Sequence, residues 1–329
     1  MGGDIFKYLI WILDDRCNLN CSHCYVHSRG WRREITKERG LKLIEEISSL
    51  GFTDIDFTGG EPLLIPEIFD YIRKSKNLGL NVSINTNGIL LNEEIIDFLK
   101  ENNVYVYVSV DGPFKEIYEK VRGANTFDKL SNNLKLLKEK NLKYSIIFSI
   151  SKLNYKYAKD MVSFAKKYNA KLCMIPVIPS GEAKKNEIYI EKDELISAIR
   201  EVKDCAEINK YTVEIWCAPF LRLLFNSPYL EIDSCPITEV LDISPNGDVL
   251  LCDVIDLPLS EIRTKSLKEA IEEVIEHPLY KEVTKIKDDC KGCKIEEFCK
   301  GGCFARSYIL TKSLLSKDPY CPKVSTGVL

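Results

Sequence analysis

The sequence lacks any long apolar run, any excess of basic charge and any low-complexity tract. No stretch approaches the ~18 apolar residues that a membrane span needs. The apolar run Tyr8–Leu13 is too short for a signal-peptide core and has no small-residue cleavage site behind it. The formal net charge of the 329 residues is −3, which gives no sign of a nucleic-acid-binding protein. We therefore expect a cytoplasmic protein that binds neither membrane nor nucleic acid.

Cysteine, by contrast, is abundant, with 13 residues in the chain. Disulfides are rare in the cytoplasm, so this number favours metal ligands. Most of the cysteines fall into spaced sets, and only Cys173, Cys205 and Cys217 stand apart. Cys173 lies in a predicted strand and Cys205 on a predicted helix, so we expect both to be packing residues.

Up to about residue 210, short β-branched apolar segments alternate with segments of helical period, as at Leu41, Ile44 and Ile47. This alternation predicts parallel strands joined by helices, in an open sheet or a barrel. The chemically distinctive residues follow the C-terminal ends of the strands, which favours a barrel. The predicted strands are Phe6–Leu13, Asp54–Thr58, Asn81–Asn85, Tyr105–Val110, Tyr144–Ile150 and Lys171–Val177.

The pattern changes after a further predicted strand, Tyr211–Trp216. Glu239–Ser244 and Asp248–Cys252 predict a hairpin, because Gly247 between them can take a positive φ. A helix is predicted over Ser266–Ile275. The remaining tail is loop-rich and dense in cysteine, so we expect bound metal to hold its structure.

Three cysteines, Cys17, Cys21 and Cys24, lie on one short loop after the first predicted strand. Three thiolates this close could hold three irons of a 4Fe-4S cube and leave the fourth iron open for chemistry. The alternative is a zinc site completed by His23 or His27.

The run from Cys17 to Tyr25 resembles the signature of the radical S-adenosylmethionine superfamily. In that family the open iron chelates S-adenosylmethionine, and one electron splits the sulfonium to release a 5′-deoxyadenosyl radical. The resemblance extends from Cys17 to Cys321. It implies an α/β fold with a partial (β/α)6 TIM-like barrel over residues 1–215. A small, loop-rich, cysteine-rich iron-sulfur domain would follow over residues 216–329.

The same resemblance implies contacts to S-adenosylmethionine. The Gly59–Pro62 run would bind its amino group, Ser109 and Asp111 its ribose hydroxyls, and Arg122 its carboxylate. From residue types alone, a plain turn at Gly59–Pro62 or Asp111 and a surface charge at Arg122 remain alternatives. The implied cofactor-binding residues are Gly59, Gly60, Glu61, Pro62, Asn85, Ser109, Asp111 and Arg122.

A second cysteine pattern, near the C-terminus, resembles the SPASM extension, which carries two auxiliary 4Fe-4S clusters. A pair of zinc sites is the alternative. The resemblance assigns Cys235, Cys252 and Cys303 to the first auxiliary cluster, and Cys290, Cys293, Cys299 and Cys321 to the second. The first set lacks a fourth cysteine. Cys217 or an oxygen of Asp233 could supply the fourth ligand, or one iron of the cluster could stay open. Cys217 could equally be a buried structural thiol.

These resemblances predict a radical S-adenosylmethionine oxidoreductase, a maturase that oxidises or cross-links a peptide or protein. Its electron would come from a donor such as flavodoxin or ferredoxin. Modification of a tetrapyrrole side chain in the haem pathway is the alternative, because the sixteen residues before Cys17 leave no room for a separate peptide-recognition domain. A non-enzymatic iron-sulfur or zinc electron-transfer module is the alternative of another class. The sequence selects no general acid or base.

Overall fold

The computed structural model describes residues 6–324, and its contacts divide the chain into two compact units. Unit 1 comprises Met1–Asn18, Tyr25–Tyr107 and Pro236–Lys281. Unit 2 comprises Leu19–Cys24, Val108–Cys235 and Glu282–Leu329. The predicted domain boundary after residue 215 stays a prediction. Among residues 6–324, no helix has both the length and the apolar character that crossing a membrane requires.

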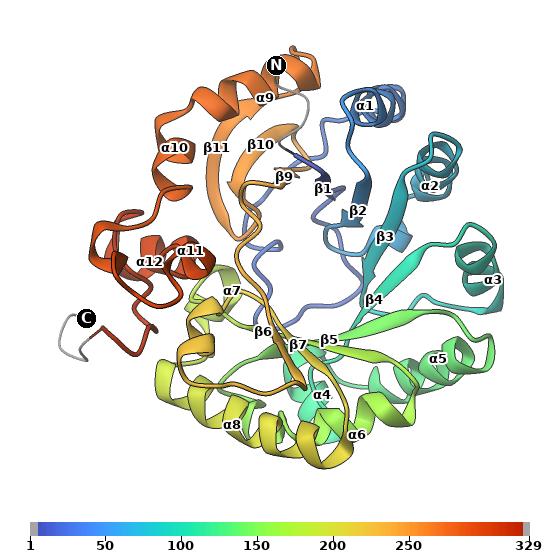
Figure 1. Ribbon diagram of the computed structural model, residues 1–329. Coiled ribbons are helices and arrows are strands. Elements are labelled where there is room, and N and C mark those ends of the chain that lie inside the picture. The colour runs from blue at the N-terminus through green and yellow to red at the C-terminus, as the bar shows by residue number, and fades with distance from the viewer. Residues whose placement is uncertain (1–5, 325–329) are drawn as a thin grey trace. The chain divides into compact units, whose positions relative to one another are not determined.

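Unit 1 is built on neighbouring strands in the order β11-β10-β9-β1-β2-β3 (Figure 1). Strand β1 pairs in parallel with both β2 and β9, whereas β9, β10 and β11 pair antiparallel. The strands are β1 Tyr8–Ile12, β2 Asp54–Thr58, β3 Asn81–Thr86, β9 Val240–Ile243, β10 Asp248–Cys252 and β11 Ile255–Glu261. The helices include α1 Lys37–Ser49, α2 Ile68–Asn77, α3 Glu93–Glu101 and α9 Leu267–Glu276, and a 3-10 turn covers Pro62–Leu64.

Unit 2 contains parallel strands in the order β5-β6-β7-β8. These are β5 Tyr144–Ile150, β6 Lys171–Pro176, β7 Val213–Ile215 and β8 Leu230–Ile232, while β4 Tyr105–Ser109 begins in unit 1 and ends in unit 2. The helices include α4 Lys115–Arg122, α5 Phe127–Glu139, α6 Asp160–Lys167, α7 Gly181–Lys185, α8 Lys192–Asn209, α11 Glu296–Cys299 and α12 Phe304–Thr311. Helix α10 Pro278–Val283 spans a boundary between the units, and short 3-10 turns cover Tyr155–Tyr157, Pro219–Leu223 and Asp288–Cys290.

Local sequence signals explain where the elements of unit 1 begin and pack. Helix α1 starts after Thr36, whose side chain accepts the backbone N–H of Arg39, and α9 starts with a capping box between Ser266 and Glu269. Trp11 of β1 stacks on Tyr71 of α2 with ring centroids 5.0 Å apart, and both side chains are buried. Aromatic packing of this kind joins helix to strand.

Several elements predicted from the sequence match the structure closely. Strands predicted over Asp54–Thr58, Tyr144–Ile150 and Asp248–Cys252 have those bounds in the structure, and the predicted C-terminal helix begins and ends one residue later. The sequence pattern does not predict the short strand β8 or the strand β11. The pattern predicts β9 only as part of a hairpin, whereas β9 pairs in parallel with β1 as well.

Candidate cofactor and cluster sites

In unit 1, Gly59 and Gly60 follow β2 and lie directly against the segment that leads to Cys17. The backbone N–H of Gly60 donates to the carbonyl of Asp14 at 2.8 Å, and that of Glu61 donates to the carbonyl of Arg16 at 2.9 Å. A Cβ on Gly60 would overlap the Arg16 carbonyl oxygen. Glycine is therefore required here by the close approach of two backbone segments.

Glu61 is buried and joins this turn to the end of β3. Its carboxylate accepts the Thr86 hydroxyl and the backbone N–H of Asn87, both at 2.8 Å. The Asn87 side chain in turn donates to Asn18 at 2.8 Å and lies 3.6 Å from the sulfur of Cys17. Hydrogen bonds therefore connect the Gly-Gly-Glu-Pro turn to the first cysteine of the loop. Asn87 is not among the site residues predicted from the sequence.

Asp56 forms a buried polar group with side chains of β1 and β3. It accepts hydrogen bonds from Ser83 and from the side chain of Asn85, and the Ser83 hydroxyl lies 3.2 Å from that of Tyr8. Burial raises the pKa of Asp56 to about 6, although these hydrogen bonds oppose the change. The predicted contact of Asn85 with S-adenosylmethionine stays a prediction, and its amide donates to Asp56.

Two further carboxylates of unit 1 lie beside the predicted cluster ligand Cys252. One ligand atom each from Asp242, Cys252 and Asp253 falls within 4.8 Å of the other two. The backbone N–H of Asp253 donates to Asp242 at 2.7 Å, and the Tyr25 hydroxyl donates to Asp253 at 2.5 Å. Burial, with the nearby charge of Asp253, raises the pKa of Asp242. Neither carboxylate is predicted from the sequence, although Asp253 directly follows a predicted ligand.

In unit 2, Asp111 and Arg122 form a buried ion pair beside the cysteine loop. The Nε of Arg122 donates to Asp111 at 2.6 Å, and Asp111 also accepts the backbone N–H of Ser149 at 2.7 Å. The Nη1 of Arg122 lies 3.7 Å from the sulfur of Cys21. Arg122 therefore lies beside a predicted cluster ligand, while its proposed bond to a cofactor carboxylate stays a prediction. The Asp111 carboxylate is already occupied by protein donors.

His23 is the neighbour of Asp111 on the loop itself. Its Nε2 lies 3.6 Å from the Asp111 carboxylate. Burial lowers the pKa of His23 to about 4, so the imidazole is neutral near pH 7. Ser109, the other residue predicted to face the ribose, is the last residue of β4 and is half-buried.

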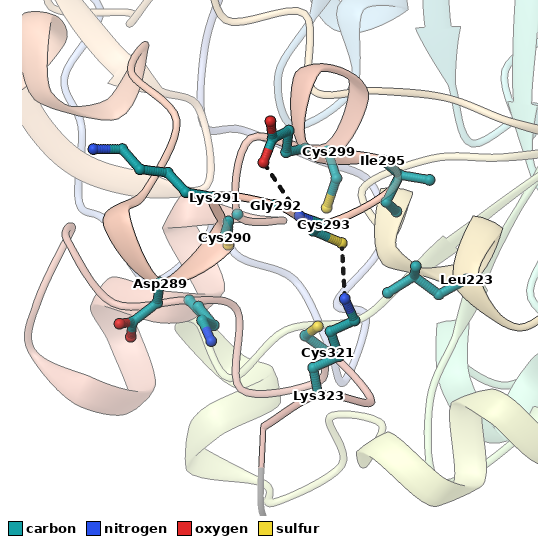
Figure 2. A pocket seen from close by; sticks show the side chains of 13 residues that line it. Leu223, Asp289, Cys290, Lys291, Gly292, Cys293, Ile295, Cys299, Cys321 and Lys323 are labelled. Carbon is teal, nitrogen blue, oxygen red and sulfur yellow. Dashed lines mark hydrogen bonds between the residues drawn. The ribbon is translucent and has the colours of Figure 1, made fainter.

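Cys290, Cys293, Cys299 and Cys321 line one pocket of unit 2, and Figure 2 shows their side chains together around it. Burial raises the pKa of Cys299 to about 12 and also raises the pKa of Cys290 and Cys321. The backbone N–H of Ile295 lowers the pKa of Cys293, and Lys323 donates to this sulfur at 3.3 Å. All four are free thiols. Four sulfurs around one hollow fit a four-iron cluster, which would displace their protons on binding.

The remaining predicted ligands are divided between the units. Cys217, Cys235 and Cys303 belong to unit 2, whereas Cys252 belongs to unit 1. The assignment of Cys235, Cys252 and Cys303 to one cluster therefore stays a prediction. Cys217 has a positive φ of 56°, a strained backbone for a residue with a side chain.

The two other isolated cysteines lie in the positions expected for packing residues. Cys173 is fully buried in β6, where its thiol donates to Glu214 at 3.1 Å. Cys205 lies on α8 and is half-buried.

Comparison with known proteins finds a radical SAM domain and several relatives of similar length. Residues 11–165 match the Radical SAM superfamily. The AdoMet-dependent heme synthase of Methanosarcina barkeri is 26% identical over 96% of this chain and 96% of its own length. The cysteine-type anaerobic sulfatase-maturating enzyme of Clostridium perfringens is 27% identical over 93% of this chain and 90% of its own length.

Solved structures give the fold. Native anSMEcpe with bound AdoMet has a TM-score of 0.75 at 23% identity, covering 95% of this chain and 94% of that one. Streptococcus suis SuiB bound to precursor peptide SuiA has a TM-score of 0.78 at 17% identity, covering 97% and 77%. This likeness confirms the predicted α/β fold class, with its parallel strands and its cysteine-rich C-terminal region.

Proposed function

We propose that the chain, which carries a radical SAM domain over residues 11–165, is a radical SAM enzyme that oxidises or cross-links a peptide or protein. When bound, the open cluster supplies the electron that cleaves S-adenosylmethionine to the 5′-deoxyadenosyl radical. Cys17, Cys21 and Cys24 would hold that cluster. The Gly59–Pro62 turn and Arg122 would hold the cofactor.

One observation carries this proposal: the pocket lined by Cys290, Cys293, Cys299 and Cys321 (Figure 2). An enzyme that only transferred a hydrogen atom would not need a second sulfur-lined site far along the chain. Oxidation of a substrate radical releases an electron, and an auxiliary cluster in this pocket would accept it. A one-electron donor such as flavodoxin or ferredoxin would then reduce the open cluster for the next turnover.

Two relatives bear on the substrate. The match to a cysteine-type anaerobic sulfatase-maturating enzyme covers 93% of this chain and 90% of that enzyme, which supports a peptide or protein substrate. A haem-pathway tetrapyrrole remains the second candidate, because the match to a heme synthase covers 96% of both chains.

Anaerobic incubation with S-adenosylmethionine and dithionite tests the enzyme class, since only a radical SAM enzyme releases 5′-deoxyadenosine. Mass spectrometry of an anaerobic host extract treated with the enzyme then tests the substrate. A mass change in a peptide supports the proposal, and a mass change in a porphyrin with no peptide altered overturns its substrate class. Zinc without sulfide in the purified chain would favour the non-enzymatic module.

A further inference from the structure

Arg306, on α12 of unit 2, is fully buried, and one of its guanidinium nitrogens has no hydrogen-bond partner among the described residues. Its Nε donates to Asp318 at 2.8 Å, and its Nη2 donates both to Asp318 and to the carbonyl of Cys217, the latter at 3.1 Å. The orphan is Nη1. A buried cationic donor with no acceptor is unfavourable, so this nitrogen marks a place where an acceptor belongs.

The surroundings of Arg306 point to sulfur as that acceptor. Its backbone N–H donates to the sulfur of Cys303 at 3.4 Å, and Cys303 is the residue that precedes α12. The backbone N–H of Cys303 itself donates to Asp318 at 2.9 Å. Cys303 is a predicted ligand of the first auxiliary cluster and Cys217 is one candidate for its fourth ligand. The Arg306–Asp318 pair contacts both residues.

The guanidinium cannot easily turn away from this position. Its centre lies 5.6 Å from the ring centroid of Phe220 and 4.5 Å from that of Tyr320. The carboxylate of Asp318 is also fixed, because it accepts the backbone N–H of Tyr320 at 3.0 Å. The direction of Nη1 is therefore set by packing before any cluster is bound.

We propose that Arg306 is a positioning residue for the auxiliary iron-sulfur cluster held by Cys303, donating through Nη1 to a sulfur of that cluster and raising its reduction potential. Hydrogen bonds to cluster sulfurs and nearby charge both set such potentials. A cationic donor stabilises the reduced form, which carries one more negative charge, more than the oxidised form. The inference rests on the auxiliary cluster of the proposed function and not on the identity of its substrate.

The test uses the full chain with Cys17, Cys21 and Cys24 changed to alanine, so that only auxiliary clusters contribute signals. Two changes are compared in this background after anaerobic reconstitution. Arg306→Lys keeps the charge but loses the forked donors. Arg306→Gln combined with Asp318→Asn removes both charges and leaves no buried carboxylate unpaired. Iron content and an electron paramagnetic resonance redox titration are measured for each.

We expect full auxiliary iron in both proteins and a more negative potential for one cluster only, because both proteins lose the forked guanidinium donor. Arg222→Lys is the matched control. Arg222 stacks on Phe298 with 3.6 Å to the ring centroid and donates to the Ile232 carbonyl at 3.1 Å. This control should leave both potentials unchanged.

Unchanged potentials with full iron in both Arg306 proteins would overturn the proposal. Loss of the same cluster from both would also overturn it, because Arg306 would then be part of the ligand scaffold alone. If only the double variant loses iron, the cluster's reduction potential in Arg306→Lys tests the proposal, and an unchanged potential overturns it. A parent chain that takes up no auxiliary iron refutes this inference. Absent 5′-deoxyadenosine release from the native chain refutes the proposed function alone.

Discussion

The carboxylate of Glu61 accepts the backbone N–H of Asn87 at 2.8 Å, and this bond ties the turn after β2 to the turn after β3. The first of these turns carries the Gly-Gly-Glu-Pro motif, and the second follows the strand that contains Asn85. The bond shows that Glu61 acts inside the protein, where it aligns the two turns. The surface offered to S-adenosylmethionine by this part of unit 1 is therefore expected to be backbone.

Replacing Glu61 with glutamine should destabilise the chain. The Gln amide would present N–H donors where the carboxylate now accepts from Thr86 and Asn87. A buried donor left unsatisfied costs about 1–3 kcal/mol of unfolding free energy. Glu67→Gln is the control, because Glu67 makes a partly exposed ion pair with Arg33, which contributes roughly 0–1 kcal/mol. Equal losses in urea unfolding would contradict the role of Glu61.

Arg122→Lys should weaken binding of S-adenosylmethionine while the iron content stays intact. A single ammonium group cannot both pair with the buried Asp111 and fork onto a carboxylate. Lysine is preferred to alanine here because alanine would leave Asp111 buried and unpaired, at a cost of about 3–5 kcal/mol.

Calorimetry of the reconstituted protein would measure the affinity, and we expect it to fall about tenfold, or about 1.4 kcal/mol. Lys120→Ala, an exposed position on the same helix, serves as the control. Normal affinity in Arg122→Lys would remove Arg122 from the cofactor site.

Cys217→Ala should change the spectrum and the reduction potential of the first auxiliary cluster, because ligand identity sets both. Cleavage of S-adenosylmethionine should survive, since the open cluster has its own three thiolates. Product formation should fall. Cys205→Ala, which removes a half-buried thiol on α8, is the matched control. A spectrum identical to that of the native protein would make Cys217 a packing thiol and leave an open or oxygen-ligated iron.

The stability of the chain should fall with rising pH through the titration of Asp56. The pKa of Asp56 is about 6 in the folded chain, whereas an unperturbed aspartate has a pKa of 3.8. Between these pH values the folded state therefore binds more protons than the unfolded state. The free energy of unfolding therefore decreases from about pH 4 to about pH 6, by up to roughly 3 kcal/mol.

Asp56→Asn cannot ionise and should lose this contribution. Urea unfolding at several pH values would show the variant gaining stability relative to the native protein across that interval. Parallel curves for the two proteins would contradict the raised pKa.

The sequence predicted several strands well because the signal for a strand is local. β-Branched runs and glycine turns specify β2, β5 and β10 within a few residues, so their bounds are correct. The pairing of β9 with β1 joins residues far apart in the chain, and no local pattern records it. The short strand β8 has too few residues to show periodicity.

The sites divide in the same way. The spacing of the cysteines predicts them as ligands, whereas the residues around them carry no such signal. Asn87 is distant from Cys17 in the sequence, and only the fold brings it beside that sulfur. Asp253 and Arg306 follow Cys252 and Cys303 closely in the sequence, but nothing in the sequence separates them from other polar residues. The family resemblance pointed to Asp111 and Arg122. These two residues form a buried ion pair with each other, and the sequence does not reveal that pairing.

Cys17, Cys21 and Cys24 are proposed to hold a cluster that cleaves S-adenosylmethionine. The most direct measurement is 5′-deoxyadenosine release with dithionite under anaerobic conditions, alongside iron content, for the native chain and for the variant with alanine at all three positions. We predict release by the native chain with roughly 12 irons, and none by the variant, which should keep about 8. Release by the variant, or a native chain that binds zinc without sulfide and releases nothing, would contradict the account.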